Sequence, residues 1–173
     1  MTKARQLTLG LAGFAWLVLV AGAHSESLAP DAKLPDPVEK TFRAAFPNAE
    51  IQKLDVEDED GVKVYDFEFK DGDVERETDI SDDGTMLEVT LVIDPKTVPA
   101  GPMKAIRKAA KGATLGRTEK IEVTWEIKDG KIVKLPKMAT RYAAEMTKGD
   151  QKAEIIVNAK GGVVDAPKWV PAS

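Results

Sequence analysis

The sequence predicts an α+β fold built from two tandem repeats, each consisting of one helix and a four-stranded antiparallel sheet. A set of six residues occurs twice at a constant spacing of 77 positions, an amphipathic helix precedes each set, and Gly/Asp turns separate short strands. The matched residues are Tyr65, Glu68, Gly72, Asp73, Glu77 and Gly84 in the first repeat and Tyr142, Glu145, Gly149, Asp150, Glu154 and Gly161 in the second. Six ungapped matches indicate one structural unit used twice.

The first 23 residues are typical of a secretory signal peptide. Lys3 and Arg5 precede the uncharged apolar run Leu9–Ala23, which ends in a small-x-small cleavage pattern. This run of 15 residues is shorter than the roughly 20 that a membrane-spanning helix needs. We therefore expect cleavage near Ala23 and a periplasmic or secreted mature chain without a membrane span. Residues 24–34 are expected to form its flexible N-terminus.

The first repeat, residues 35–94, begins with a predicted helix. Asp36 and Glu39 form a D-x-x-E capping pattern, and Pro37 suits the first helical position. Apolar residues then recur on one face of the helix, at Val38, Phe42, Ala45 and Phe46. Pro47-Asn48 ends the helix.

Four strands are expected after this helix, over Glu50–Asp58, residues 62–70, Val74–Ser81 and Met86–Ile93. In the second of them, Tyr65, Phe67 and Phe69 alternate with polar residues, so that the aromatic side chains share one face. The turns between strands are too short to join parallel strands, which predicts an antiparallel sheet. Packing the helix on the apolar face gives two layers and leaves the polar face exposed.

The second repeat, residues 99–170, has the same predicted order. A helix is expected over Pro102–Lys111, with Gly112 as its left-handed cap. The repeat spacing is 64 at the helix and 77 further on, so 13 residues are inserted within Thr118–Met138. The basic stretch Lys131–Lys137 is either an extra loop or a strand extension. Strands are expected around Ile121–Lys128, Tyr142–Met146, Ala153–Val157 and Val163–Trp169.

The two repeats carry opposite charge. Residues 24–98 contain 21 acidic and 8 basic side chains, a net charge of −13, whereas residues 99–173 contain 8 and 15, a net charge of +7. This contrast is explained either by drift of surface charge after duplication or by attraction to a partner or between the repeats. The lysines of the second repeat form a candidate basic patch, but export and a net negative mature chain argue against nucleic acid as a ligand.

Several short motifs together resemble a known family. They are Phe42…Phe46-Pro47-Asn48-Ala49, Asp60-Gly61-Val62, Val64-Tyr65-Asp66-Phe67-Glu68 and Asp82-Asp83-Gly84-Thr85. This pattern resembles the PepSY-like family and, more narrowly, its β-lactamase-inhibitor-like members, which are exported bacterial proteins. The resemblance covers about residues 35–169 and implies tandem helix-plus-four-strand repeats that bind or inhibit another protein. The second repeat departs from it, with Ala143-Ala144 in place of Asp66-Phe67.

Catalytic and metal chemistry find little support in the sequence. The chain has one histidine, His24, and no cysteine, so neither a nucleophile–base pair nor a histidine-ligated metal site can be assembled. The stretch Asp79–Gly84 matches the start of an EF-hand loop, but position twelve is Thr90 where a glutamate is needed. A hairpin turn explains it better. We expect no enzyme activity and no cofactor.

The expected function is that of an exported, non-catalytic binding module that contacts a protein partner through a sheet face, with an inhibitor-like role. The candidate binding residues on that face are Asp66, Glu68, Glu75, Glu77, Asp79, Glu145 and Glu154. An alternative is an envelope protein that binds a divalent cation or small ligand weakly through the acidic first repeat. A third interpretation is self-association through the opposed charges of the two repeats.

Overall fold

The computed structural model describes residues 25–29 and 32–172, so the predicted signal peptide lies outside the described residues. The elements in chain order are β1 (Ser25–Leu28), α1 (Asp36–Ala45), β2 (Glu50–Glu59), β3 (Val62–Asp71), β4 (Val74–Ser81), β5 (Met86–Val92), the 3-10 turn η1 (Pro95–Thr97), α2 (Ala100–Ala109), β6 (Thr114–Lys128), β7 (Lys131–Lys148), β8 (Gln151–Asn158), β9 (Val163–Asp165) and β10 (Val170–Pro171). None of the helices in this part of the chain is long and apolar enough to cross a membrane.

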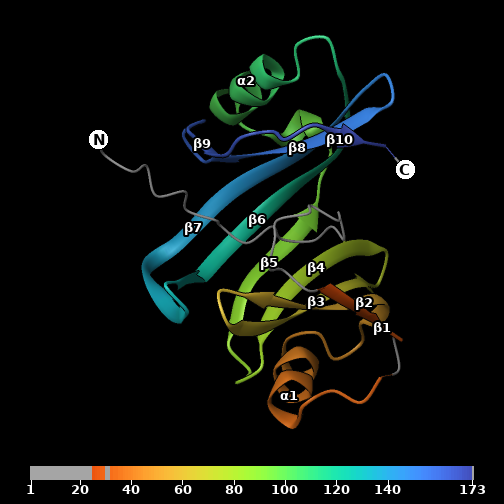
Figure 1. Ribbon diagram of the computed structural model, residues 1–173, viewed down its shortest axis with the longest axis vertical. Coiled ribbons are helices and arrows are strands. Elements are labelled where there is room, and N and C mark those ends of the chain that lie inside the picture. The colour runs from red at the N-terminus through yellow and green to blue at the C-terminus, as the bar shows by residue number, and fades with distance from the viewer. Residues whose placement is uncertain (1–24, 30–31, 173) are drawn as a thin grey trace.

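All ten described strands belong to one antiparallel sheet, and the predicted α+β fold of two separate helix-plus-four-strand repeats is therefore wrong. The strand order is β1-β2-β3-β4-β5-β6-β7-β8-β10, with β9 also paired to β8. The fold is predominantly β, with two short helices at opposite ends of the sheet (Figure 1). The prediction failed because local turn signals identify hairpins only, and the pairing of β5 with β6 joins strands that a helix separates in sequence.

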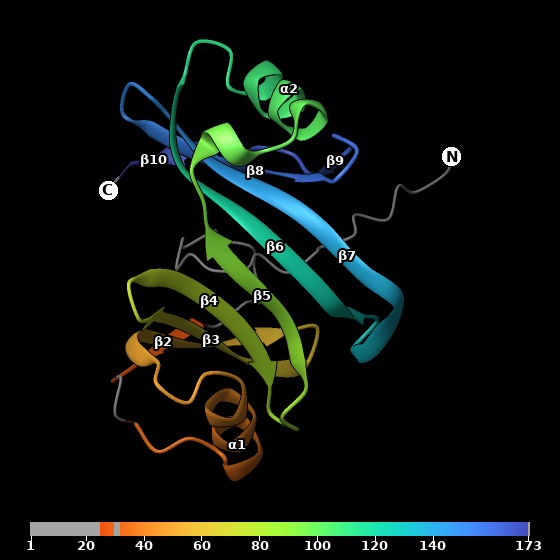
Figure 2. The same cartoon turned by 180° about the vertical axis from the view of Figure 1, so that it is seen from behind.

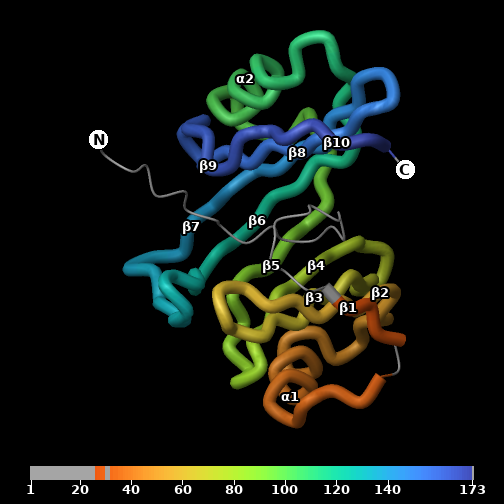
Figure 3. Tube along the Cα trace, in the orientation of Figure 1, coloured from red at the N-terminus to blue at the C-terminus, as the bar shows by residue number. Residues whose placement is uncertain are grey.

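The β5–β6 pairing makes the sheet continuous. Its register runs from Glu88 opposite Val123 to Val92 opposite Glu119. Figure 3 shows the chain leaving β5, passing through α2 and returning as β6 beside β5. The basic stretch Lys131–Lys137 is part of β7, so the inserted residues lengthen β6 and β7 into a long hairpin rather than forming a loop.

Both helices lie on the same face of the sheet. Val89 of β5 packs in the core under α1. It pairs with Glu122 of β6, which in turn pairs with Thr140 of β7. Tyr142, two residues further along β7, packs in the core under α2. Because side chains two residues apart share a face of a strand, the register places both cores on one side. Figure 2 shows the sheet running between the two helices from the other side.

The core under α1 is aromatic. Phe42 is fully buried and stacks on Phe67, with ring centroids 4.4 Å apart, and it contacts the edge of Phe69 at 5.1 Å. The core under α2 is mainly aliphatic, with Ile106 of the helix set against Met146 and Ile155 of the sheet, and it includes one buried tyrosine, Tyr142. The alternation in the sequence correctly predicted the aromatic face of β3.

Two glycines allow the hairpin turns to approach the helix starts closely. Gly84 has a φ of +86°, and a Cβ there would lie 2.8 Å from the carbonyl oxygen of Pro37. Gly161 has a φ of +85°, and its Cβ would lie 2.6 Å from the carbonyl oxygen of Gly101. The Thr41 hydroxyl donates a hydrogen bond to the Gly84 carbonyl at 2.8 Å. The predicted Asp36 cap does not form, because Pro35 is the N-cap residue of α1 and no side chain caps it.

We expect Phe42→Ala to lower the free energy of unfolding by about 3–5 kcal/mol, because it removes a buried ring and leaves a cavity. Urea denaturation followed by circular dichroism measures this loss. Phe42→Leu, which keeps most of the apolar volume, should cost clearly less. A loss below about 1 kcal/mol for the alanine variant would contradict the packing of α1 on β3.

Candidate binding face

The face of the sheet opposite the helices carries most of the acidic strand residues. All seven candidate residues from the sequence lie at positions that alternate onto this face, which we call the uncovered face: Asp66, Glu68, Glu75, Glu77, Asp79, Glu145 and Glu154. Cross-strand pairing brings Asp66 opposite Asp79, Glu68 opposite Glu77, and Glu145 opposite Glu154. The register therefore groups acids that are far apart in sequence.

Four neighbouring strands form a carboxylate row across the uncovered face. Asp55 of β2 pairs with Asp66 of β3, Asp66 with Asp79 of β4, and Asp79 with Glu88 of β5. Residues directly opposite each other on adjacent strands have Cβ atoms about 4.5–5.5 Å apart, and like charges in such pairs are destabilising. The carboxylate row is therefore an unfavourable arrangement for folding alone, which makes it the candidate functional feature.

Sequence reasoning missed two members of this row. Asp55 lies in β2, whose alternation is irregular because a register shift interrupts its pairing with β3 after Ile51. Glu88 lies between Leu87 and Val89, so its outward direction follows from alternation alone, but nothing in the sequence shows which strand lies beside it.

Lys53 and Arg117 supply positive charge at the borders of the carboxylate row. Lys53 Nζ lies 2.6 Å from an oxygen of Asp55 and 3.1 Å from one of Glu68. No ion pair within the described residues reaches Asp66 or Asp79, and one carboxylate oxygen of Asp66 has no hydrogen-bond partner there. Asp66 and Asp79 are only 6% and 7% exposed, which differs from the exposed polar face expected from the sequence.

Burial and mutual repulsion raise the pKa values of these carboxyls. Burial is the largest cause for each. Burial, with a further contribution from Glu68, raises the pKa of Asp66 to about 8. Burial also raises the pKa of Glu88 to about 8, although Arg141 opposes this shift. The pKa of Asp79 is also raised well above its usual range, by burial and then by Asp66. At neutral pH Asp66 and Glu88 therefore retain their protons.

Arg117 links the two halves of the sheet on this face. It forms an ion pair with Glu77 of β4 and places Nε 2.6 Å from Glu119 of β6. Burial, followed by the charge of Glu119, raises the pKa of Glu77 to about 9, although Arg117 opposes the shift. Burial likewise raises the pKa of Glu119 to about 7. The Arg117 guanidinium thus forms ion pairs with two carboxyls that repel each other.

Beyond Glu88, the line of the carboxylate row continues into apolar residues on β6. Val123 occupies the position next to Glu88 in the carboxylate row. With Ile121, Ala143 and Ile156 it forms a small buried apolar cluster spanning β6, β7 and β8. The face therefore places an apolar patch directly beside a group of carboxyls.

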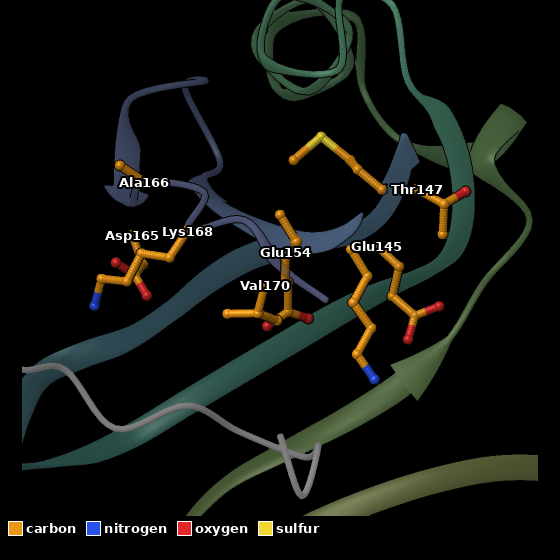
Figure 4. A pocket seen from close by; sticks show the side chains of 10 residues that line it. Glu145, Thr147, Glu154, Asp165, Ala166, Lys168 and Val170 are labelled. Atoms are coloured by element: carbon orange, nitrogen blue, oxygen red, sulfur yellow. The ribbon is translucent and has the colours of Figure 1, made fainter. Parts of the chain in front are cut away.

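A pocket lies where the C-terminal segment passes over the end of the sheet (Figure 4). It has a volume of about 180 Å³. Its lining residues are Glu145, Met146, Thr147, Lys152, Ala153, Glu154, Asp165, Ala166, Lys168 and Val170. Burial, then Glu119 and Glu145, raises the pKa of Glu154 to about 8. The pocket thus joins apolar walls to a mixture of acidic and basic side chains.

The EF-hand-like stretch is a hairpin turn, as the sequence predicted. It connects β4 to β5, and the Ser81 hydroxyl donates a hydrogen bond to a carboxylate oxygen of Asp83 at 2.7 Å. This bond and one from the Thr85 backbone hold the pKa of Asp83 below its usual value. Across residues 25–29 and 32–172, no group of three or more His, Cys, Asp or Glu side chains has the geometry of a metal site.

No family model matches the chain, and neither does any curated protein. Solved structures do match it. A BLIP-like protein of Bacteroides fragilis is 14% identical with a TM-score of 0.53, covering 82% of this chain and 90% of its own. A DUF2874 family protein of Bacteroides uniformis is 13% identical with a TM-score of 0.56, covering 80% and 91%. A Bacteroides eggerthii protein, provisionally described as periplasmic, is 14% identical with a TM-score of 0.57, covering 82% and 93%.

These likenesses concern the fold, because the identities are low. The chain has a BLIP-like fold that extends over most of its length. The PepSY-like resemblance rests on the short sequence motifs and stays a prediction.

The raised pKa values predict that the protein loses stability as the pH rises. The folded protein binds more protons than the unfolded chain between pH values of about 4.5 and 8, so the free energy of unfolding falls across that range. Thermal melts at pH 5 and pH 8.5 should show the higher melting temperature at pH 5. In Asp66→Asn/Asp79→Asn the difference should shrink, whereas Asp73→Asn/Asp150→Asn, in exposed turns, should leave it unchanged. An equal difference in both variants would contradict the role of the carboxylate row.

Arg117→Met should destabilise the protein by roughly 1–3 kcal/mol at pH 9, between the values for exposed and fully buried ion pairs. At pH 5 the loss should be smaller, because Glu77 and Glu119 are then protonated and need no counter-charge. Urea denaturation at both pH values tests this, with Arg117→Lys as the charge-preserving control. An equal loss at both pH values would show that Arg117 acts only through packing.

Proposed function

We propose that the protein is an exported, non-catalytic binding module that contacts a protein partner through the uncovered face of its sheet, with an inhibitor-like role. The observation that carries the proposal is the carboxylate row. Four strands present acids directly opposite one another, and no ion pair within the described residues neutralises Asp66 or Asp79. An arrangement that costs folding stability is expected where a ligand later supplies the missing interactions.

The placement of the two helices also supports this proposal. Both helices lie on the opposite side, so the uncovered face extends over neighbouring strands without a helix on it. A broad sheet surface suits a protein partner better than a small molecule, because protein interfaces bury about 800 Å² on each side.

The fold comparison and the N-terminal sequence support the other parts of the proposal. The BLIP-like protein of Bacteroides fragilis shares this fold, and its description as BLIP-like motivates the inhibitor-like role proposed here. Export rests on the charged, apolar and small-residue pattern of residues 1–23. The described residues of the uncovered face include no histidine, and the chain has no cysteine, which is consistent with binding rather than catalysis.

Affinity capture from an envelope extract of the source organism tests the proposal. The wild-type protein and Asp73→Asn/Asp150→Asn should retain the same partner at low salt, whereas Asp66→Asn/Asp79→Asn should lose most of it. Each variant removes two carboxyl groups, so at a pH above about 8, where Asp66 is ionised, a general electrostatic effect would weaken both. Retention of the same partner by all three proteins would place the contact elsewhere and contradict the proposal.

A further inference from the structure

The carboxylate row and its surroundings define the chemistry of the ligand more closely. Asp66 lies in the middle of the row, is 6% exposed, and has a carboxylate oxygen without a hydrogen-bond partner among the described residues. An unpaired buried carboxylate is costly and is relieved by a positive charge placed against it. Lys53 and Arg117 are already engaged with other acids of the face.

We infer that the uncovered face recognises a basic, lysine- or arginine-rich segment of its protein partner, whose side chains bind to Asp66 and Asp79. This inference rests on the proposed function, since it names the chemistry of the partner at the same face. The positive charge of such a segment complements the acids of the carboxylate row. The described positive charges border the row, whereas the two central acids are left to an incoming cation.

The length of the row sets the size of the segment. Neighbouring strands lie about 4.7–4.9 Å apart, so four carboxyls on four strands span about 14 Å. In an extended segment, side chains on one face repeat every two residues, or about 6.6–6.8 Å. About three cationic side chains at alternate positions therefore match the four carboxyls of the row.

Binding of such a segment should be linked to proton release. Asp66 is buried and surrounded by charged groups from each neighbouring strand, and burial and these groups together set its pKa. They are Lys53, Asp55 and Glu57 on β2, Glu68 on β3, Glu77 and Asp79 on β4, and Glu88 on β5, which in turn faces Arg141 of β7. Since burial, and after it the surrounding acids, raise the pKa of Asp66 to about 8, Asp66 retains its proton at neutral pH and must release it to pair with a cation. Affinity for a basic segment should therefore rise with pH.

Isothermal titration calorimetry with hexalysine tests this inference, with hexa-acetyllysine as the uncharged control peptide. Hexalysine should bind the wild-type protein at pH 8.5 and bind about tenfold more weakly at pH 6. Asp66→Asn/Asp79→Asn should lower the affinity at pH 8.5 by about tenfold, equivalent to about 1.4 kcal/mol, and should reduce the pH dependence. Asp73→Asn/Asp150→Asn should bind within about twofold of the wild type.

Three outcomes would overturn the inference. These are no binding of hexalysine, equal binding by both double variants, and equal binding of acetylated and free peptide. If hexalysine does not bind, a titration with calcium chloride shows whether the carboxylate row is instead a site for a divalent cation. If affinity capture still depends on Asp66 and Asp79 while hexalysine fails, the binding face stands and only its basic ligand is wrong.

Discussion

The antiparallel pairing of β5 with β6 is the constraint on which the rest of this structure depends. It joins two groups of strands, separated in sequence by α2, into a single sheet. Its register decides which side chains share a face, since a shift by one residue would exchange the two faces of every later strand. In the observed register both helix cores lie on one side, and the carboxylate row, Arg117 and the apolar cluster lie on the other. The helices therefore do not cover the acids.

The two faces of the sheet have opposite effects on stability. On one face, fully buried side chains such as Phe42, Phe67 and Ile106 stabilise the fold by removing apolar surface from water. On the other, the like charges of Asp66, Asp79 and their neighbours destabilise it, and protonation lessens that penalty. Stability and ligand binding thus depend on the same protons. A cationic ligand would replace these protons and supply the counter-charge that the described part of the protein does not.

The sequence predicted the faces of individual strands but not the pairing of strands that are distant in the chain. The alternation around Tyr65 and Phe67 correctly assigned both faces of β3, because a strand has a strict two-residue period. The same rule placed Asp66 and Asp79 on one face. The single sheet, the row partners Asp55 and Glu88, and the bridge from Arg117 to Glu77 were not found, since each depends on which strands are neighbours. Such pairings join residues far apart in the chain and leave no turn signal. The resemblance to inhibitor-like proteins likewise suggested two repeats, whereas the strands form one sheet.

In the free protein Asp66 and Glu88 of the uncovered face hold protons, and we expect them to release these protons to a basic ligand. Carbon-13 NMR of the side-chain carboxyl groups, followed through a pH titration with and without hexalysine, measures this directly. We expect midpoints near pH 8 for Asp66 and Glu88 in the free protein, and these midpoints should fall when hexalysine is present. Midpoints near pH 4 for Asp66 and Glu88 in the free protein, or midpoints that hexalysine leaves unchanged, would contradict this expectation.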